Sequence, residues 1–171
     1  MVRLCFLDDN EALQNVLRYQ IIGKTNDFEC FSPQRYDVFV AIRNNELRLS
    51  LLEQLKALVF YLPIIIHVTA YVSPSTTLKE RTCMLVGNVV HTNTVIEEDC
   101  IINVNMIVDH ATHIQKGCHF VSGAIVCSHV MIGEQVVIGA GTCVKTNSKV
   151  PSFYQLDKLE VYKEEKNEEN V

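Results

Sequence analysis

Three side chains that could carry acid–base chemistry stand close together: Asp109, His110 and His113 lie within NVNMIVDHATHI, residues 103–114. The rest of this segment consists mainly of small and β-branched residues. Histidine titrates near neutrality, so it can take a proton from an attacking hydroxyl or amine. An adjacent carboxylate such as Asp109 can orient the ring and stabilise its charged form. Neighbours on a strand point to opposite sides, so a direct Asp109–His110 contact requires the pair to lie at a corner.

The sequence around this segment repeats every six residues. Fifteen positions in steps of six are all apolar: Ile66, Val72, Leu78, Met84, Val90, Ile96, Ile102, Val108, Ile114, Phe120, Val126, Ile132, Ile138, Val144 and Val150. Four residues after each of the first fourteen comes a small or medium-sized residue, with Met106 as the one larger side chain. A tight inward corner requires residues of that size.

A period of six fits neither an α-helix, which repeats every 3.6 residues, nor a simple series of hairpins. A β-sandwich would instead show turn signals at irregular intervals. The period is typical of short strands wound into a parallel coil, and it resembles the hexapeptide repeat of the left-handed parallel β-helix. In that fold three hexads complete one turn, so residues 18 apart stack on the same face. The fifteen positions therefore predict about five coils in a mainly β protein.

We expect a small α/β unit before the coil. Residues 2–10 and 36–45 read as buried strands, and residues 44–58 as an amphipathic helix. The helix would have Asn45 as its N-cap and a stripe of leucines at positions 47, 51, 55 and 58. After Val150 the six-residue period stops and the sequence becomes strongly charged. The predicted domains are therefore residues 1–62 for the α/β unit, 63–150 for the coil and 151–171 for a charged extension.

Composition excludes several classes of protein. The formal net charge is −5 and no basic cluster is present, which argues against a nucleic-acid partner. No run approaches the ~18 apolar residues of a membrane span. The seven cysteines form neither a CxxC pair nor a zinc-type spacing, so we expect reduced thiols, no metal and a cytoplasmic protein.

Together these parts resemble one branch of the hexapeptide acyltransferases, the bacterial sialic acid O-acetyltransferases and nucleotide-sugar N-acetyltransferases. The matching segments are FLDDN (6–10), IIGKTNDF (21–28), VFVAIRNNELR (38–48), IHVTAYVSPSTTL (66–78), IINVNMIVDHATHI (101–114) and HFVSGAIVCSHVMIGEQVVIGAGTCV (119–144). Two features depart from the family's pattern. The chain starts at the family's second strand, without the first strand and Gly-rich turn, and Arg43 stands where the family has a glycine.

The resemblance implies a reaction and a set of residues. Acetyl-CoA would be the donor, a sugar or nucleotide sugar the acceptor, and His110 the general base beside Asp109. Residues on the coenzyme A side would be His119, Ser128, Gly139 and Ala140. Residues on the acceptor side would be Asp8 and Asp9.

The eighteen-residue turn adds a geometric expectation. His110 and His119 are half a turn apart and so lie on different sides of one prism. If both act on one thioester, the site lies between subunits, and cyclic symmetry then makes a homotrimer the natural assembly, as in the family.

Two other functions are open to test. A carbonic anhydrase of this fold would use an H-x4-H pair, but Gln115 and Cys118 stand five residues after His110 and His113. A non-catalytic trimeric scaffold that has lost its acceptor site is the stronger alternative. The identity of the acceptor, and whether an oxygen or a nitrogen is acetylated, stays open.

Overall fold

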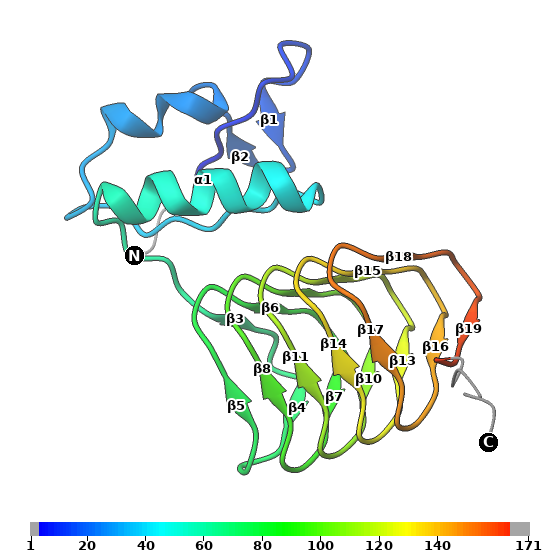
Figure 1. Cartoon of the computed structure of the whole chain (residues 1–171). Coiled ribbons are helices and arrows are strands. Elements are labelled where there is room, and N and C mark those ends of the chain that lie inside the picture. Colours follow the sequence, from blue (N-terminus) through cyan, green and yellow to red (C-terminus); the bar gives the residue numbers. More distant parts are fainter. Residues whose placement is uncertain (1–3, 165–171) are drawn as a thin grey trace, which may run out of the picture.

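The computed structural model describes residues 4–164, which form a long prism with a small unit above one of its faces (Figure 1). The prism is a left-handed parallel β-helix of about five coils, as the six-residue period predicts. Every strand of the prism is two residues long, and each strand inside a sheet pairs with the strands one coil before and after it. Val108, for example, pairs with Val90 and with Val126, so the repeat is 18 residues.

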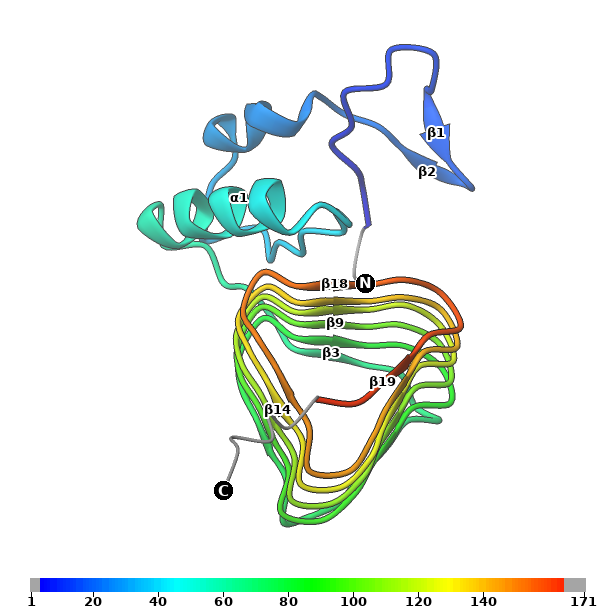
Figure 2. The ribbon, with the colours of Figure 1, turned by 45° about the vertical axis from the view of Figure 1, so that its right-hand side comes forward.

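Three parallel sheets make the faces of the prism. The covered sheet, which lies beneath the small unit (Figure 2), consists of β3 (Ile65–Ile66), β6 (Cys83–Met84), β9 (Ile101–Ile102), β12 (His119–Phe120), β15 (Val137–Ile138) and β18 (Gln155–Leu156). The second sheet consists of β4 (Tyr71–Val72), β7 (Val89–Val90), β10 (Ile107–Val108), β13 (Ile125–Val126), β16 (Cys143–Val144) and β19 (Val161–Tyr162). The third sheet consists of β5 (Thr77–Leu78), β8 (Val95–Ile96), β11 (His113–Ile114), β14 (Met131–Ile132) and β17 (Lys149–Val150).

The interior of the prism is built from the two predicted sets of positions. The second residue of each strand from Met84 to Leu156 is at most 2% exposed. Burying each such aliphatic side chain contributes roughly 1.5–3 kcal/mol. The corner residues four positions later, from Asn88 to Ser148, are also buried, and the threonine hydroxyls among them donate to backbone carbonyls. Thr94 donates to the carbonyl of Asp109 at 3.1 Å and Thr112 to that of Cys127 at 3.0 Å.

Each corner turns through a residue with a left-handed backbone. Every sixth residue from position 81 to position 159 has a positive φ: Arg81, Gly87, Asn93, Asp99, Asn105, Ala111, Gly117, Gly123, His129, Gln135, Gly141, Asn147, Phe153 and Leu159. This conformation costs a non-glycine residue roughly 1–2 kcal/mol. Backbone hydrogen bonds between stacked corners hold these residues, as from Ala111 N to Thr92 O at 3.0 Å.

The coil continues beyond Val150, where the sequence analysis set the end of the domain. The strands β18 and β19 belong to a further turn, and Leu156 fills the interior with 1% exposure. Two glycines that the period did not explain accommodate this turn. A Cβ on Gly133 would lie 2.4 Å from Ser152 N, and one on Gly139 2.5 Å from the carbonyl carbon of Asp157. Charged residues are tolerated here because they point outward.

The small unit contains β1 (Asn15–Val16), β2 (Tyr19–Gln20), a 3₁₀ helix at Thr25–Cys30 and the α-helix α1 at Asn45–Ala57. The strands predicted at residues 2–10 and 36–45 do not form as such. Among the described residues these runs make single bridges, Phe6 to Ile21 and Asp37 to Tyr61.

Helix α1 differs from its prediction in two respects. Its N-cap is Asn44, whose side chain accepts from Leu47 N at 2.8 Å, rather than Asn45. Its buried face is Arg48, Leu51, Leu52 and Leu55, whereas Leu47 is 50% and Leu58 41% exposed. The apolar face is therefore rotated from the predicted leucine stripe, because the leucines of α1 complete a second core with Phe28, Val40 and Phe60, and Arg48 contacts the coil.

Polar contacts from α1 fix the small unit on its own coil. Arg48 is 1% exposed, and its Nη2 donates to the carbonyls of Gly117 at 2.8 Å and Asp99 at 3.4 Å. Asn45 Nδ2 donates to the carbonyl of Gln135 at 2.9 Å. The three acceptors are 18 residues apart, so α1 contacts three successive coils at one corner. No helix in residues 4–164 is long and apolar enough to cross a membrane.

Candidate active site

Asp109 and His110 lie at the corner that follows β10, as a contact between them requires. Both are half-buried. The carboxylate does not bond to the ring, however: Asp109 Oδ1 accepts from the backbone N–H of His110 at 2.7 Å. Asp109 N in turn donates to Val126 O at 2.8 Å. The carboxylate thus fixes the backbone at the corner and leaves the ring of His110 to other neighbours.

Those neighbours are two further histidines. The ring of His129 lies 5.1 Å from that of His110, centroid to centroid, at 90°. The ring of His91 lies 6.2 Å away on the other side, at 63°. Neither histidine was predicted to lie beside His110. Their spacing of 19 residues, one more than a coil, is the signal that could have found them.

Cys127 and Ser128 stand one coil beyond Asp109 and His110. Ser128, which stacks one coil beyond His110, is half-buried, and its carbonyl accepts from Asn147 N at 3.2 Å. Burial raises the pKa of the Cys127 thiol, and the nearby Cys143 and Asp109 raise it further. Cys127 is therefore a neutral thiol rather than a competing nucleophile.

His119 lies on the covered sheet, in β12, so it is on a different face from the corner that carries His110. The expectation that the two histidines are on different sides of the prism is therefore confirmed. The side chain of His119 is 3% exposed. Burial, reinforced by the positive charges of Arg48 and Arg43, lowers the pKa of His119 to about 4. The ring is consequently neutral at pH 7.

Gly139 and Ala140 lie at the corner after β15, in the last turns of the coil, and both are half-buried. The carbonyl of Ala140 accepts from Leu159 N at 2.8 Å. This corner and that of His110 belong to different strands and different coils, so one chain does not gather all the predicted residues around one point.

Asp8 and Asp9 belong to the small unit. Asp8 Oδ1 accepts from Asn10 N at 2.8 Å, and Asp9 Oδ1 accepts from Thr25 N at 2.9 Å. The hydrogen bonds from Thr25 lower the pKa of Asp9, which is therefore ionised at neutral pH. Both carboxylates order the local backbone and retain further lone pairs for a ligand.

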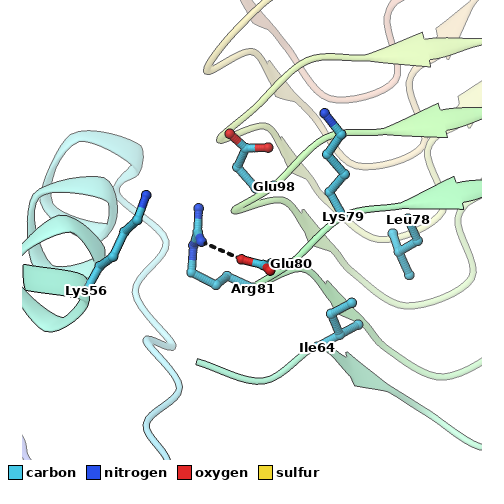
Figure 3. A pocket seen from close by; sticks show the side chains of 7 residues that line it. All are labelled: Lys56, Ile64, Leu78, Lys79, Glu80, Arg81 and Glu98. Atoms are coloured by element: carbon cyan, nitrogen blue, oxygen red, sulfur yellow. Dashed lines mark hydrogen bonds and ion pairs between the residues drawn. The ribbon is translucent and has the colours of Figure 1, made fainter. Parts of the chain in front are cut away.

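Two hollows in the described part of the chain lie away from His110. One of about 380 Å³ opens between α1 and the first coils (Figure 3) and is lined by Lys56, Ile64, Leu78, Lys79, Glu80, Arg81 and Glu98. Ion pairs cross this region, from Arg81 to Asp99 at 2.5 Å and to Glu80 at 3.2 Å. The other, of about 310 Å³, is lined by Glu97, Glu98, His113, Gln115, Lys116 and Glu134. Residues 4–164 contain no cluster of three side chains suited to a metal.

The chain is similar to one protein-family model and to the three solved structures given below. A family model described as the PglD N-terminal domain matches residues 2–55. The acetyltransferase domain of PglB from Neisseria gonorrhoeae, solved in complex with acetyl coenzyme A, is 31% identical with a TM-score of 0.89, over 94% of this chain and 78% of that one. PerB from Caulobacter crescentus, in complex with CoA and GDP-perosamine, is 26% identical with a TM-score of 0.84, over 91% and 74%. WeeI from Acinetobacter baumannii, 18% identical with a TM-score of 0.57 over 88% and 81%, shares the fold.

Proposed function

The chain belongs to the hexapeptide-repeat sugar acetyltransferases, and we propose that it moves an acetyl group from acetyl-CoA to a hydroxyl or amine of a sugar, with His110 as general base. One observation carries the proposal. The similarity to a domain solved with acetyl coenzyme A extends over 94% of the chain, coil and small unit together. Perosamine N-acetyltransferase has also been solved as variants of a single histidine with CoA and GDP-perosamine bound.

The reaction needs one base and no covalent intermediate on the protein, because a thioester is already activated. The acceptor oxygen or nitrogen attacks the carbonyl carbon, the new bond forms and the carbon–sulfur bond breaks. His110 takes the proton from the acceptor and returns it to the sulfur of the departing coenzyme A. Asp109 contributes by holding the backbone N–H of His110 and by its negative charge beside the imidazolium.

His119, Ser128, Gly139 and Ala140 are proposed to bind the donor. The small residues Gly139 and Ala140 would let the pantetheine arm lie against the outer coils. His119 is neutral, so it can accept or donate one hydrogen bond toward the thioester without carrying charge. Its low exposure within one chain means that only a small edge of the ring would meet the ligand.

We infer that the enzyme is a homotrimer whose sites lie between subunits. The second sheet carries an outward row that is apolar throughout the described coils: Tyr71, Val89, Ile107, Ile125, Cys143 and Val161. Ile107 and Ile125 are 44% and 39% exposed. The corresponding row of the third sheet includes Thr77, His113 and Lys149. An apolar stripe of this kind is typical of a subunit interface, and it borders the corner of His110.

A nucleotide-linked amino sugar is the acceptor we favour, because PerB was solved with GDP-perosamine. Asp8 and Asp9, in the unit that matches the PglD N-terminal domain, are proposed to contact the nucleotide part. A sialic acid is the other candidate. A cytoplasmic location fits either substrate, since all seven cysteines are free thiols.

A non-catalytic scaffold is the second candidate, favoured by one observation. Arg43 stands in the loop directly before α1, where the sugar-nucleotide acetyltransferases that this chain resembles have a glycine. A long side chain there would hinder close approach of a nucleotide sugar to the backbone.

Thiol release from acetyl-CoA separates the two functions. We expect release with a nucleotide-linked amino sugar and a loss of at least about 100-fold on His110→Ala. A panel of free and nucleotide-linked amino sugars and sialic acids would identify the acceptor. The scaffold reading would hold if coenzyme A fails to bind at millimolar concentration in a calorimetric titration. Activity that His110→Ala leaves unchanged would remove His110 from the mechanism.

A further inference from the structure

The ring of His110 lies between two other imidazole rings, and we propose that His129, assisted by His91, is a positioning residue that holds His110 in the orientation for proton abstraction. The inference rests on the proposed role of His110 as base. The inference concerns which residues orient the His110 ring. The carboxylate of Asp109 accepts from the backbone N–H of His110 through Oδ1, so this contact does not orient the ring.

The geometry of the rings supports this role. Aromatic pairs favour edge-to-face arrangements with centroids 4.5–7 Å apart. The His110–His129 pair, at 5.1 Å and 90°, meets both conditions, and the His91–His110 pair, at 6.2 Å and 63°, meets them less closely. Rings packed on both sides of His110 restrict its rotation about χ2. The distribution of this torsion angle is otherwise broad for histidine.

A backbone hydrogen bond between His129 and His110 also fixes the two residues relative to each other. The backbone N–H of His129 donates to the carbonyl of His110 at 3.1 Å, so the two residues are joined both through the main chain and through their rings. His129 is the left-handed residue of its corner, with φ of 58°. Ala111, with φ of 54°, has the same place one coil earlier, directly after His110. The three histidines thus occupy three successive positions of the corner in three successive coils.

His91 completes the row on the opposite side. Its Nδ1 is 3.2 Å from Thr92 Oγ1, which sets the orientation of its own ring. The larger separation from His110 makes its contribution the smaller of the two. Both flanking histidines are exposed, so they reach the edge of the prism where an acceptor would approach.

The corner itself offers matched substitutions at His129. Asn93 and Asn147 occupy equivalent left-handed corners with φ of 54° and 62°, so His129→Asn removes the ring without straining the backbone. Phe153 occupies another, with φ of 63°, so His129→Phe keeps an aromatic ring and removes both nitrogens. His67→Asn, an exposed histidine bonded to Thr69 away from the row, is the control.

Steady-state kinetics and NMR test the proposal together. We expect His129→Asn to lower kcat about tenfold with KM for acetyl-CoA changed less than twofold, His129→Phe to retain kcat within about threefold, and His67→Asn to match the wild type. The ring signals of His110 should shift or broaden in His129→Asn and stay sharp in His129→Phe.

Either of two results would overturn the positioning role. One is full kcat with unchanged His110 signals in His129→Asn, and the other is an equal loss in His129→Phe and His129→Asn. The NMR signals report on ring orientation even if no acceptor supports turnover. Failure of the proposed function and failure of this inference are therefore separate outcomes.

Discussion

Two histidines of the candidate site meet opposite electrostatic conditions. His110 is half-buried at a corner beside the carboxylate of Asp109, whereas His119 is 3% exposed beneath α1, near two arginines. The family motif pointed to both residues, and their separation followed from the repeat. The burial of His119 could not be predicted, because it depends on which face of the coil the small unit covers. His91 and His129 were not predicted beside His110 because they are 19 residues from it. Residues that stack directly in this coil are 18 apart, so each ring is offset by one position.

The buried imidazole of His119 predicts a loss of stability in acid. Its folded-state pKa of about 4 lies below the value of about 6.5 expected in the unfolded chain. The unfolded state therefore binds the extra proton between these pH values. The contribution of the neutral His119 ring to the unfolding free energy is fully present above pH 6.5. This contribution falls as the pH approaches 4, by at most about 3 kcal/mol.

Urea denaturation at pH 7.5 and pH 5 measures this effect, with His119→Gln as the matched variant. The glutamine keeps a polar side chain of similar size but does not titrate. We expect the difference in unfolding free energy between the two pH values to be smaller in His119→Gln than in the wild type. An equal difference in both proteins would show that His119 is not the group that titrates.

At the scale of elements, the coil was predictable and the small unit much less so. An unbroken period of six predicts strand positions, interior residues and inward corners, because each hexad packs only on its neighbours. Helix α1 offered two plausible faces, one with Leu47 and Leu58 and one with Arg48 and Leu52. Contacts with the coil bury the face with Arg48 and Leu52. The local sequence pattern does not show which face of the helix the coil will contact.

Arg48 is the clearest case of such a contact. We expect Arg48→Met to lower the unfolding free energy by about 2–4 kcal/mol, because the carbonyls of Gly117 and Asp99 lose their buried donor. Chemical denaturation measures the change. Glu53→Ala, an exposed position on α1, serves as the control and should change stability by less than about 0.5 kcal/mol. Equal stability of Arg48→Met and the wild type would mean that Arg48 does not hold α1 on the coil.

At the scale of the whole molecule, the proposed assembly follows from the contrast between faces. The covered sheet is occupied by the small unit, and the second sheet has an apolar outward row that nothing in the described chain covers. The sequence predicted a trimer from the family resemblance and from the separation of His110 and His119. It could not say which face mediates the contact.

Ile107→Glu tests the second sheet as the interface. Burying a glutamate against the apolar row of a neighbour is unfavourable, so we expect light scattering to show dissociation of the trimer and thiol release to fall with it. Thr77→Glu places the same charge on an exposed strand of the third sheet and should leave the assembly intact. Dissociation by Thr77→Glu alone would assign the interface to the third sheet instead.

Mixing two inactive variants tests most directly that His110 and His119 act on one thioester from neighbouring subunits. We expect His110→Ala and His119→Ala each to lose thiol release on its own. The two variants are then unfolded together and refolded in equal amounts. Random assembly into trimers gives both native histidines to about a quarter of the sites, so we predict about a quarter of wild-type thiol release. Mixed trimers that form but show no recovered activity would contradict a site shared between subunits.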